Sequence, residues 1–310
     1  MSSGIKIFAP ATVANVACGF DILGFAIDKP GDEIIAKLNP NRKGLQITKI
    51  TGDKGKLPYE VEKNTAGVAA LRLLEHLGTD QGVDLEIHKK MPFGSGLGSS
   101  AASAAGGVYA VNKLLKTGLS DWDILPFAVE GEAVADGSVH ADNVAASLLG
   151  GMTMCRDNNT LDVHRVHVPK GLYATLVYPH IKILTSEARA ILKPDVTLTG
   201  AITQSANLAG LIIGLQNGDF DLIGRSLQDV LVEPQRKVLI PGFDDVKAGA
   251  MKAGALGCSI SGAGPSIFAL CKNSLDAENA GRNMQAAFDA QGIKNDLFIS
   301  PINMDGCIVL

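Results

Sequence analysis

The sequence predicts an α+β protein of two domains, and three observations carry that prediction. The chain has 310 residues, and single hydrophobic cores stop growing at roughly 250 to 300 residues. Its start is rich in short strand-like runs, whereas its second half alternates helical and strand-like segments. Pro169 and Gly171 separate the two halves. We therefore expect one domain over 1–168 and another over 169–310.

In the first half, alternating and β-branched runs predict strands over 5–7, 32–38, 45–50 and 83–87. Pro10 is expected to end the first strand, because proline lacks the N–H that a sheet ladder needs. Apolar residues at helical spacing predict a helix over 64–77, with Gly78 as its stop. An alanine-rich run predicts a second helix over 101–115.

In the second half, the same criteria predict helices over 199–215, 220–230, 242–252 and 276–291, and strands near Leu172, Ala255, Ser266 and Phe298. The apolar run 208–215 is much shorter than the ~20 residues that a membrane-spanning helix needs. We interpret it as part of a core helix.

The composition indicates a soluble globular protein of the cytoplasm. Hydrophobic residues make up 46% and charged residues 19% of the chain, and the net charge is −4. A chain without a positive field is not expected to bind nucleic acid or an anionic membrane surface. Five scattered cysteines and the absence of a secretory signal pattern predict buried, reduced thiols.

The glycine-rich segment 92–102 carries the densest chemical signal. It lies between a predicted strand and a predicted helix, where backbone N–H groups and a helix N-terminus can bind a polyphosphate. No Lys-Ser or Lys-Thr follows its last glycine, and Ser99 stands where a dinucleotide loop has its third glycine. The alternative interpretations are a flexible linker and a tight packing turn. Its place between strand and helix favours phosphate binding.

This segment, Pro-x-Gly-x-Gly-Leu-Gly-Ser-Ser-Ala-Ala, closely resembles the ATP loop of the GHMP kinases, named for galactokinase, homoserine kinase, mevalonate kinase and phosphomevalonate kinase. The segments 9–15 (APATVAN) and 261–266 (SGAGPS) agree with the family in order and spacing. The resemblance implies a ribosomal-S5-like N-terminal domain, a ferredoxin-like C-terminal domain and an active site between them. It implies that ATP is bound by Pro92, Phe93, Gly94, Ser95, Gly96, Leu97, Gly98, Ser99, Ser100, Ala101 and Ala102, with Asn64 as an adenine contact.

The resemblance also implies the groups that act on the phosphate. Mg²⁺ would be held by Ser100 and Glu130, together with phosphate oxygens. Relatives with a catalytic aspartate place it seven residues before a Gly-Gly pair, and here that residue is Asn143, with Asp142 one step away. An amide orients a hydroxyl but takes no proton at neutral pH. Catalysis is therefore expected to come from alignment and charge neutralisation.

On the acceptor side, five segments resemble those of the family members that phosphorylate L-homoserine to O-phospho-L-homoserine in threonine biosynthesis. They are 9–24, 140–145, 148–151, 185–189 and 233–243. Arginine forks suit the carboxylate of that amino acid, whereas an aspartate and an asparagine suit its ammonium group. The predicted acceptor residues are Asn15, Asp21, His140, Arg189 and Arg236.

Two alternatives remain. One is a GHMP kinase for another small alcohol, such as mevalonate or shikimate, against which the acceptor residues argue. The other is a catalytically silent binding protein, against which the predicted metal pair argues. A homodimer is the family-level expectation for the assembly.

Overall fold

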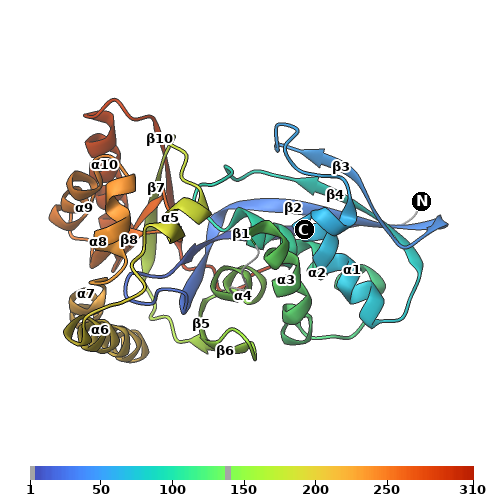
Figure 1. The fold of residues 1–310 in the computed structure, drawn as a ribbon, viewed down its shortest axis with the longest axis horizontal. Helices are drawn as coiled ribbons and strands as arrows, with labels where there is room; N and C mark the ends of the chain where they lie inside the picture. Colours follow the sequence, from blue (N-terminus) through green and yellow to red (C-terminus); the bar gives the residue numbers. More distant parts are fainter. Residues whose placement is uncertain (1–3, 137–140) are drawn as a thin grey trace.

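Two β-sheets organise the chain in the computed structural model, which describes residues 4–136 and 141–310. The larger sheet has seven strands, with β5 and β6 joined to the path β11-β1-β2-β4-β3 through β2. The smaller sheet has the order β10-β7-β9-β8. In Figure 1 the smaller sheet and its helices lie to the left of the larger one. The predicted α+β class is confirmed.

The strands of the larger sheet are β1 (Ile5–Ala14), β2 (Leu23–Lys43), β3 (Leu45–Thr51), β4 (Gln81–His88), β5 (Met152–Asp157), β6 (Asp162–Val166) and β11 (Ile308–Val309). The prediction that the first strand ends at Pro10 is wrong. Pro10 pairs with Gly31 inside β1, and the register shifts between Pro10 and Thr12. The shift follows Pro10 directly, so the missing proline donor falls where the regular ladder is already interrupted.

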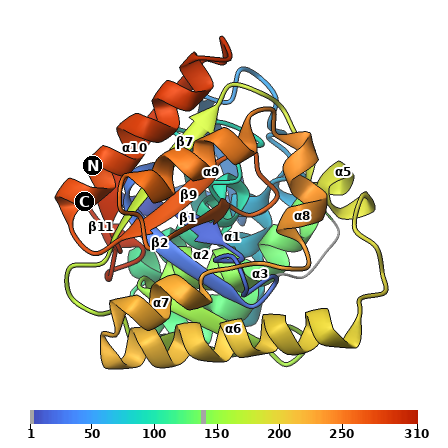
Figure 2. The same cartoon turned by 90° about the vertical axis from the view of Figure 1, so that its left-hand side faces the viewer.

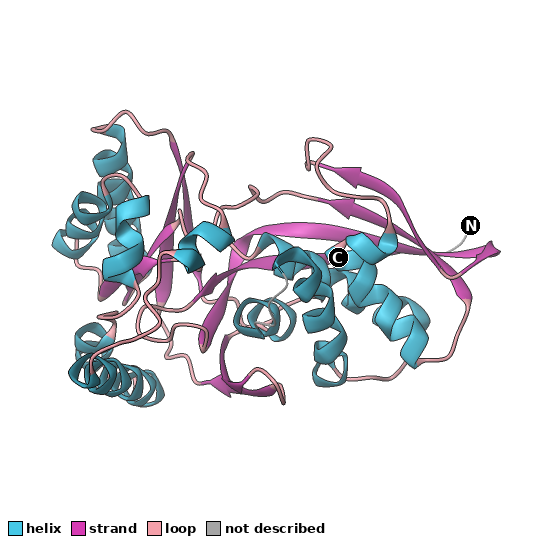
Figure 3. Ribbon diagram, in the orientation of Figure 1, coloured by secondary structure: helices cyan, strands magenta, loops and turns pink. Residues whose placement is uncertain are grey.

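Four helices pack on this sheet: α1 (Thr65–His76), α2 (Ser99–Leu115), α3 (Asp121–Asp136) and α4 (Ala141–Leu149). Figure 3 shows them gathered on one side of the strands. The alanine-rich α2 is buried from Ala101 to Asn112. It contacts β1 and β2 as well as α1, α3 and α4. Small side chains allow this central helix to approach all of its neighbours closely. The short 3₁₀ helix η1 (Val61–Lys63) precedes α1.

The smaller sheet contains β7 (Tyr173–Pro179), β8 (Gly257–Ile260), β9 (Ile267–Cys271) and β10 (Asn295–Pro301). Its helices are α5 (Thr185–Ala190), α6 (Leu198–Asn217), α7 (Phe220–Ser226), α8 (Glu233–Arg236), α9 (Phe243–Lys252) and α10 (Ser274–Asp289), with the 3₁₀ helix η2 (Lys237–Leu239) after α8. All strand pairs are antiparallel. The order, with a β8–β9 hairpin and helical crossovers, is that of a ferredoxin-like βαββαβ unit.

The chain passes from the larger to the smaller sheet between β6 and β7, around the predicted boundary at 168/169. It later returns, because Ile302 bridges to Ile27 and β11 pairs with β1. The division of the chain into 1–168 and 169–310 stays a prediction.

The run 208–215, predicted as part of a core helix, forms the second half of helix α6 and contributes Leu211 and Leu215 to the core, whereas no residue of 198–207 is buried. Figure 2 shows α6 along the lower edge of the molecule. Only Leu211, Gly214 and Leu215 are buried, whereas Leu198 is 77% and Ile202 61% exposed. It is the one helix of the described part of the chain that is long and apolar enough to cross a membrane, judged by length and composition alone. It is a surface helix that contributes one narrow face to the fold.

The cysteines behave as predicted. Cys18, Cys155, Cys258, Cys271 and Cys307 are all buried free thiols. Burial raises the pKa of Cys18 to about 12, so this thiol stays protonated at neutral pH.

Candidate functional site

A cavity of about 250 Å³ lies between the two halves of the chain and contains most of the predicted site. The glycine-rich loop forms one wall, and Asn15, Asp21, Arg189 and Arg236 form the other. Its lining residues are Ala14, Asn15, Asp21, Phe93, Gly94, Ser95, Gly96, Gly98, Ser99, Ser100, Glu132, Asp142, Asn143, Ile183, Thr185, Arg189, Arg236, Gly262, Ala263 and Gly264. The glycine-rich loop and a pair of arginines therefore face one space.

The glycine-rich loop has the backbone that an anion site requires. Gly94, Gly96 and Gly98 have φ angles of 62°, 77° and 64°, a region that L-residues with side chains adopt rarely. Gly98 caps α2 without a side-chain hydrogen bond. The first N–H groups of α2 lack intrahelical acceptors, and the helix dipole is positive there. Ser99 Oγ is buried without a hydrogen-bond partner among the described residues. These donors suit a phosphate group.

The second glycine turn, 261–264, packs directly against this loop. Ser261 Oγ donates to the Gly96 carbonyl over 2.6 Å. The Ser266 N–H donates to the Ser95 carbonyl over 3.1 Å. The turn between β8 and β9 of the smaller sheet thus forms hydrogen bonds with the glycine-rich loop that follows β4 of the larger sheet.

A buried ion pair that the sequence did not reveal anchors the start of the loop. Lys89, 1% exposed in its side chain, pairs with the fully buried Asp32. Lys89 Nζ also donates to the Ser99 carbonyl at 2.6 Å and to Ser103 Oγ at 2.7 Å. Burial lowers the pKa of Lys89, and the Asp32 carboxylate opposes that shift. The pair ties β2 and the end of β4 to the first turn of α2.

Not every predicted nucleotide contact lies in the cavity. Pro92, Leu97, Ala101 and Ala102 do not line it, and Leu97 and the two alanines are fully buried. Asn64, predicted as an adenine contact, caps α1 instead. Its Oδ1 accepts from the N–H groups of Ala66 and Gly67, and its Nδ2 donates to the Pro58 carbonyl. This 3%-exposed side chain is used within the fold.

The predicted metal pair needs one correction, because Glu130 does not reach the cavity. Its carboxylate is 53% exposed and pairs with Arg72 Nε at 3.0 Å. Glu132 lines the cavity, and its Oε1 accepts a 2.6 Å hydrogen bond from Ser100 Oγ. Residues two apart on a helix point in nearly opposite directions. A carboxylate and a hydroxyl at the helix N-terminus form an oxygen donor set of the kind that Mg²⁺ prefers.

Asn143 lies in the cavity, as predicted. Its Oδ1 accepts from Thr12 Oγ1 over 2.7 Å, which fixes the side-chain amide next to Gly98. Asp142 also lines the cavity and is 4% exposed, and its Oδ1 accepts from the Asn143 N–H. His140, predicted on the acceptor side, lies outside the described residues.

The two predicted arginines have different surroundings. Arg189 forms a two-pronged ion pair with Asp21, with N–O distances of 3.0 and 3.1 Å. Arg236 is 4% exposed and donates to the carbonyls of Ala188 and Gly262. Burial, with a further contribution from Arg189, lowers its pKa to about 10, so it stays charged at neutral pH. Both guanidinium groups lie over the ring of Phe20, a contact that the sequence did not predict.

The segment that carries Asn15 and Asp21 has an uncommon backbone. Asn15, Val16, Ala17 and Asp21 have φ angles of 72°, 42°, 57° and 57°. Such angles are unfavourable for residues with a side chain, above all for β-branched valine. Asn15 Nδ2 donates to the Gly262 carbonyl, and its Oδ1 accepts from the Asp21 N–H. Tertiary contacts hold a strained loop at the acceptor side of the cavity.

The loop packing predicts different effects at neighbouring glycines. A Cβ on Gly96 would lie 2.4 Å from the Ser261 carbonyl, whereas one on Gly94 would meet only the Ile183 carbonyl at 3.7 Å. Both have positive φ, so both alanine variants carry backbone strain of about 1 kcal/mol. We expect Gly96→Ala to weaken ATP binding at least about ten-fold beyond Gly94→Ala, because it also displaces the second glycine turn. Calorimetric titration with a non-hydrolysable ATP analogue measures both, and equal affinities would contradict this packing argument.

Comparisons with known proteins agree with this geometry. The model of the GHMP kinases N terminal domain matches residues 64–151, and that of the GHMP kinases C terminal matches residues 211–290. A homoserine kinase of Chlorobium phaeobacteroides (strain BS1) is 46% identical, covering 98% of both chains. One of Xylella fastidiosa (strain 9a5c) is 40% identical, covering 98% of this chain and 94% of the relative.

Solved structures agree as well. The crystal structure of homoserine kinase from Cytophaga hutchinsonii is 54% identical, with a TM-score of 0.97 over 100% of this chain and 98% of that one. A mevalonate kinase of L. major, 18% identical with a TM-score of 0.70 over 97% of this chain and 99% of that one, shares the fold.

Proposed function

The chain belongs to the GHMP kinase family, and we propose that it transfers the γ-phosphoryl group of ATP to the side-chain hydroxyl of L-homoserine. One observation carries the proposal. The cavity joins a phosphate-binding loop to the charged set of Asp21, Arg189 and Arg236. A zwitterionic amino acid presents a carboxylate and an ammonium group, which match that set in sign.

The Arg189–Asp21 ion pair suits exchange with such a substrate. When the substrate binds, its carboxylate replaces Asp21 as a partner of Arg189, and its ammonium replaces Arg189 as a partner of Asp21. Each charge then keeps an opposite partner, which limits the cost of desolvation. Arg236 is fixed by the Ala188 and Gly262 carbonyls and supplies a second guanidinium for the carboxylate. Mevalonate and shikimate lack the ammonium group that Asp21 would bind.

On the phosphate side, the N–H groups at the start of α2 and the glycine-rich loop would hold the ATP phosphates. We propose that Glu132 and Ser100 hold Mg²⁺ together with phosphate oxygens. The metal, when bound, neutralises charge that develops on the transferred group. Lys89 and Asp32 position the loop from beneath without lining the cavity.

Asn143, fixed by Thr12, would orient the attacking hydroxyl towards the phosphate. An amide cannot accept the hydroxyl proton, so alignment and charge neutralisation supply most of the rate enhancement, and the proton passes late to an oxygen of the transferred phosphoryl group. The five buried free thiols support a cytoplasmic site of action, where cysteines are kept reduced.

An acceptor panel tests the proposal. The purified chain, with ATP and Mg²⁺, is assayed by coupled ADP formation on homoserine, mevalonate, shikimate and galactose. We expect a specificity constant for homoserine at least about a hundred-fold above the others, since unpaired buried charges strongly disfavour wrong acceptors. A preference for another alcohol would identify a different GHMP kinase. No ADP formation with any acceptor would indicate a silent binding protein.

A further inference from the structure

Gln204, on helix α6, forms hydrogen bonds to two segments at the acceptor side of the cavity. Gln204 Nε2 donates to the Cys18 carbonyl at 3.2 Å and to Asp229 Oδ1 at 3.0 Å. Its Oε1 accepts from the Val230 N–H at 2.9 Å. One side chain thus joins two segments that lie far apart in the sequence. Cys18 belongs to the strained loop 15–21, and Asp229 and Val230 begin the segment 229–236.

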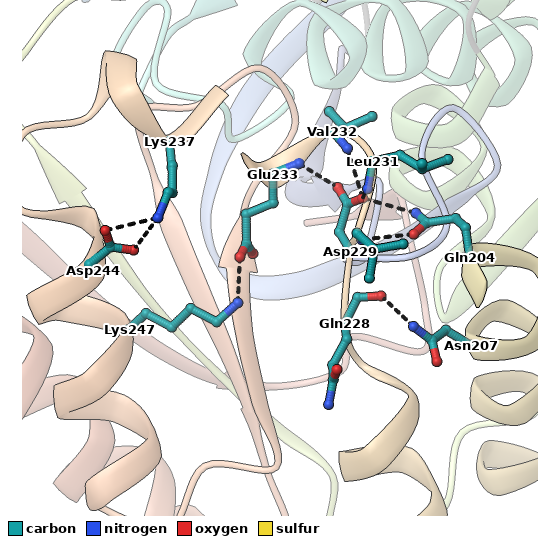
Figure 4. A network of polar contacts seen from close by, with 11 residues as sticks. Gln204, Asn207, Gln228, Asp229, Leu231, Val232, Glu233, Lys237, Asp244 and Lys247 are labelled. Atoms are coloured by element: carbon teal, nitrogen blue, oxygen red, sulfur yellow. Dashed lines mark hydrogen bonds and ion pairs between the residues drawn. The ribbon is translucent and has the colours of Figure 1, made fainter. Parts of the chain in front are cut away.

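The second segment delivers Arg236, and Asp229 organises it. The Asp229 carboxylate accepts from the N–H groups of Leu231, Val232 and Glu233 at 2.8 to 2.9 Å. Figure 4 shows these bonds converging on Asp229, with Gln204 approaching from the other side. Asp229 therefore satisfies the N–H groups of the turn that leads into α8 and of its first residue, and α8 is the short helix that ends at Arg236. A shift of Asp229 would shift the guanidinium.

The first segment depends on outside support, because its backbone is strained. Asn15, Val16, Ala17 and Asp21 all have positive φ, and such a conformation persists only where surrounding contacts impose it. The Gln204 contact to the Cys18 carbonyl is one of them, in the middle of the loop. Most of α6 is exposed, so this contact is a specific polar bridge within a surface helix.

We propose that Gln204 is a positioning residue for the acceptor subsite, which sets the spacing between loop 15–21 and Arg236. The hydrogen bonds of Gln204 to the two segments, here called the bridge, keep the acidic Asp21 at a fixed distance from the basic Arg236. The expected kinetic effect rests on the proposed function, which assigns Asp21 to the ammonium group of homoserine and Arg236 to its carboxylate. It requires no contact between Gln204 and the substrate.

The test compares Gln204→Leu with Asn207→Leu. Asn207 lies on the same helix, and its Nδ2 donates to the Gln228 carbonyl at 3.0 Å (Figure 4). Among the described residues, no hydrogen bond joins the Asn207 side chain to loop 15–21. The control thus removes an α6 hydrogen bond to the neighbouring segment without removing the bridge. Both variants retain an apolar stem of similar length.

We expect Gln204→Leu to raise the KM for homoserine about ten-fold and to change the KM for ATP less than about two-fold, with Asn207→Leu near wild type in both. Backbone hydrogen exchange of the unliganded protein should be faster in 15–21 and 229–236 for Gln204→Leu only. Gln204→Glu keeps the acceptor for Val230 but loses both donated bonds. It should reproduce the selective rise, and it serves if Gln204→Leu folds poorly.

Equal rises in both KM values, or an unchanged homoserine KM with unchanged exchange, would overturn the inference. If the wild-type chain does not phosphorylate homoserine, the proposed function fails, and the hydrogen-exchange measurement alone tests whether Gln204 joins the two segments. Faster exchange in both segments of Gln204→Leu would still support the bridge, and unchanged exchange would refute it.

Discussion

Replacing Glu132 with alanine is expected to lower kcat by at least about a hundred-fold while the protein stays folded. The variant removes the carboxylate that accepts from Ser100 in the cavity, and with it the proposed protein carboxylate ligand of Mg²⁺. The side chain contributes little to the apolar core, so the loss should appear in turnover. The measurement is kcat at saturating ATP and homoserine over a magnesium titration, with a thermal melt for folding.

Glu130→Ala is the matched control on the same helix. Its carboxylate is 53% exposed and pairs with the half-exposed Arg72, an interaction of a kind that contributes at most about 1 kcal/mol. Turnover should therefore stay within about two-fold of wild type. Near-normal turnover of Glu132→Ala at high magnesium, or a comparable loss in Glu130→Ala, would show that the metal ligand is misassigned.

Replacing Arg236 with alanine is expected to act on the acceptor and not on the nucleotide. Loss of a charge-assisted bond in a shielded site costs about 2 to 5 kcal/mol, or roughly 30-fold to several thousand-fold in kcat/KM for homoserine. The variant also leaves the Ala188 and Gly262 carbonyls without this donor. Arg236→Lys keeps the charge but loses the fork, so it should recover only part of the activity. Steady-state kinetics with each substrate varied measures the effect.

An acceptor that has the hydroxyl and the ammonium group but no carboxylate, 3-aminopropan-1-ol, is the control substrate. Wild type and Arg236→Ala should use it about equally poorly, and the apparent affinity for ATP should change little. An equal loss on both acceptors, or a loss of ATP binding, would show that Arg236 does not bind the carboxylate.

Much of the fold could be predicted, because the decisive patterns are local. Helical spacing between Asn64 and Leu77 predicted α1, and the alternation over 83–87 predicted β4. The continuation of β1 through Pro10 could not be predicted in this way. It depends on a register shift against Gly31, which is a property of strand pairing and not of the segment itself.

The helical period of α3 could have indicated Glu132 in place of Glu130 as the proposed metal ligand. Trp122, Pro126, Glu130 and Val134 are spaced by four residues, and all are exposed. Ile124 and Ala128 are fully buried, and Glu132 follows at the same spacing. A carboxylate at the same helical spacing as buried residues is the better candidate for a site, because a buried carboxylate requires polar or charged partners. The family motif alone did not indicate which face of α3 is buried.

Other residues had no local signal. Lys89 and Asp32 are 57 positions apart, and Gln204 is 186 positions from Cys18. Such pairs arise from tertiary packing, and each residue taken alone resembles a surface polar group. Asn64 is the opposite case, since an asparagine directly before a helix predicts an N-cap, and the capping role is the one in the structure.

Identification of the product tests the central claim most directly. The chain is incubated with ATP, Mg²⁺ and L-homoserine, and the reaction is followed by proton-coupled ³¹P NMR. We predict equimolar ADP and a phosphomonoester whose signal is split by the two protons of the side-chain methylene. That splitting places the phosphate on the homoserine hydroxyl. ADP with inorganic phosphate alone, or ADP formation independent of homoserine, would contradict the proposed reaction.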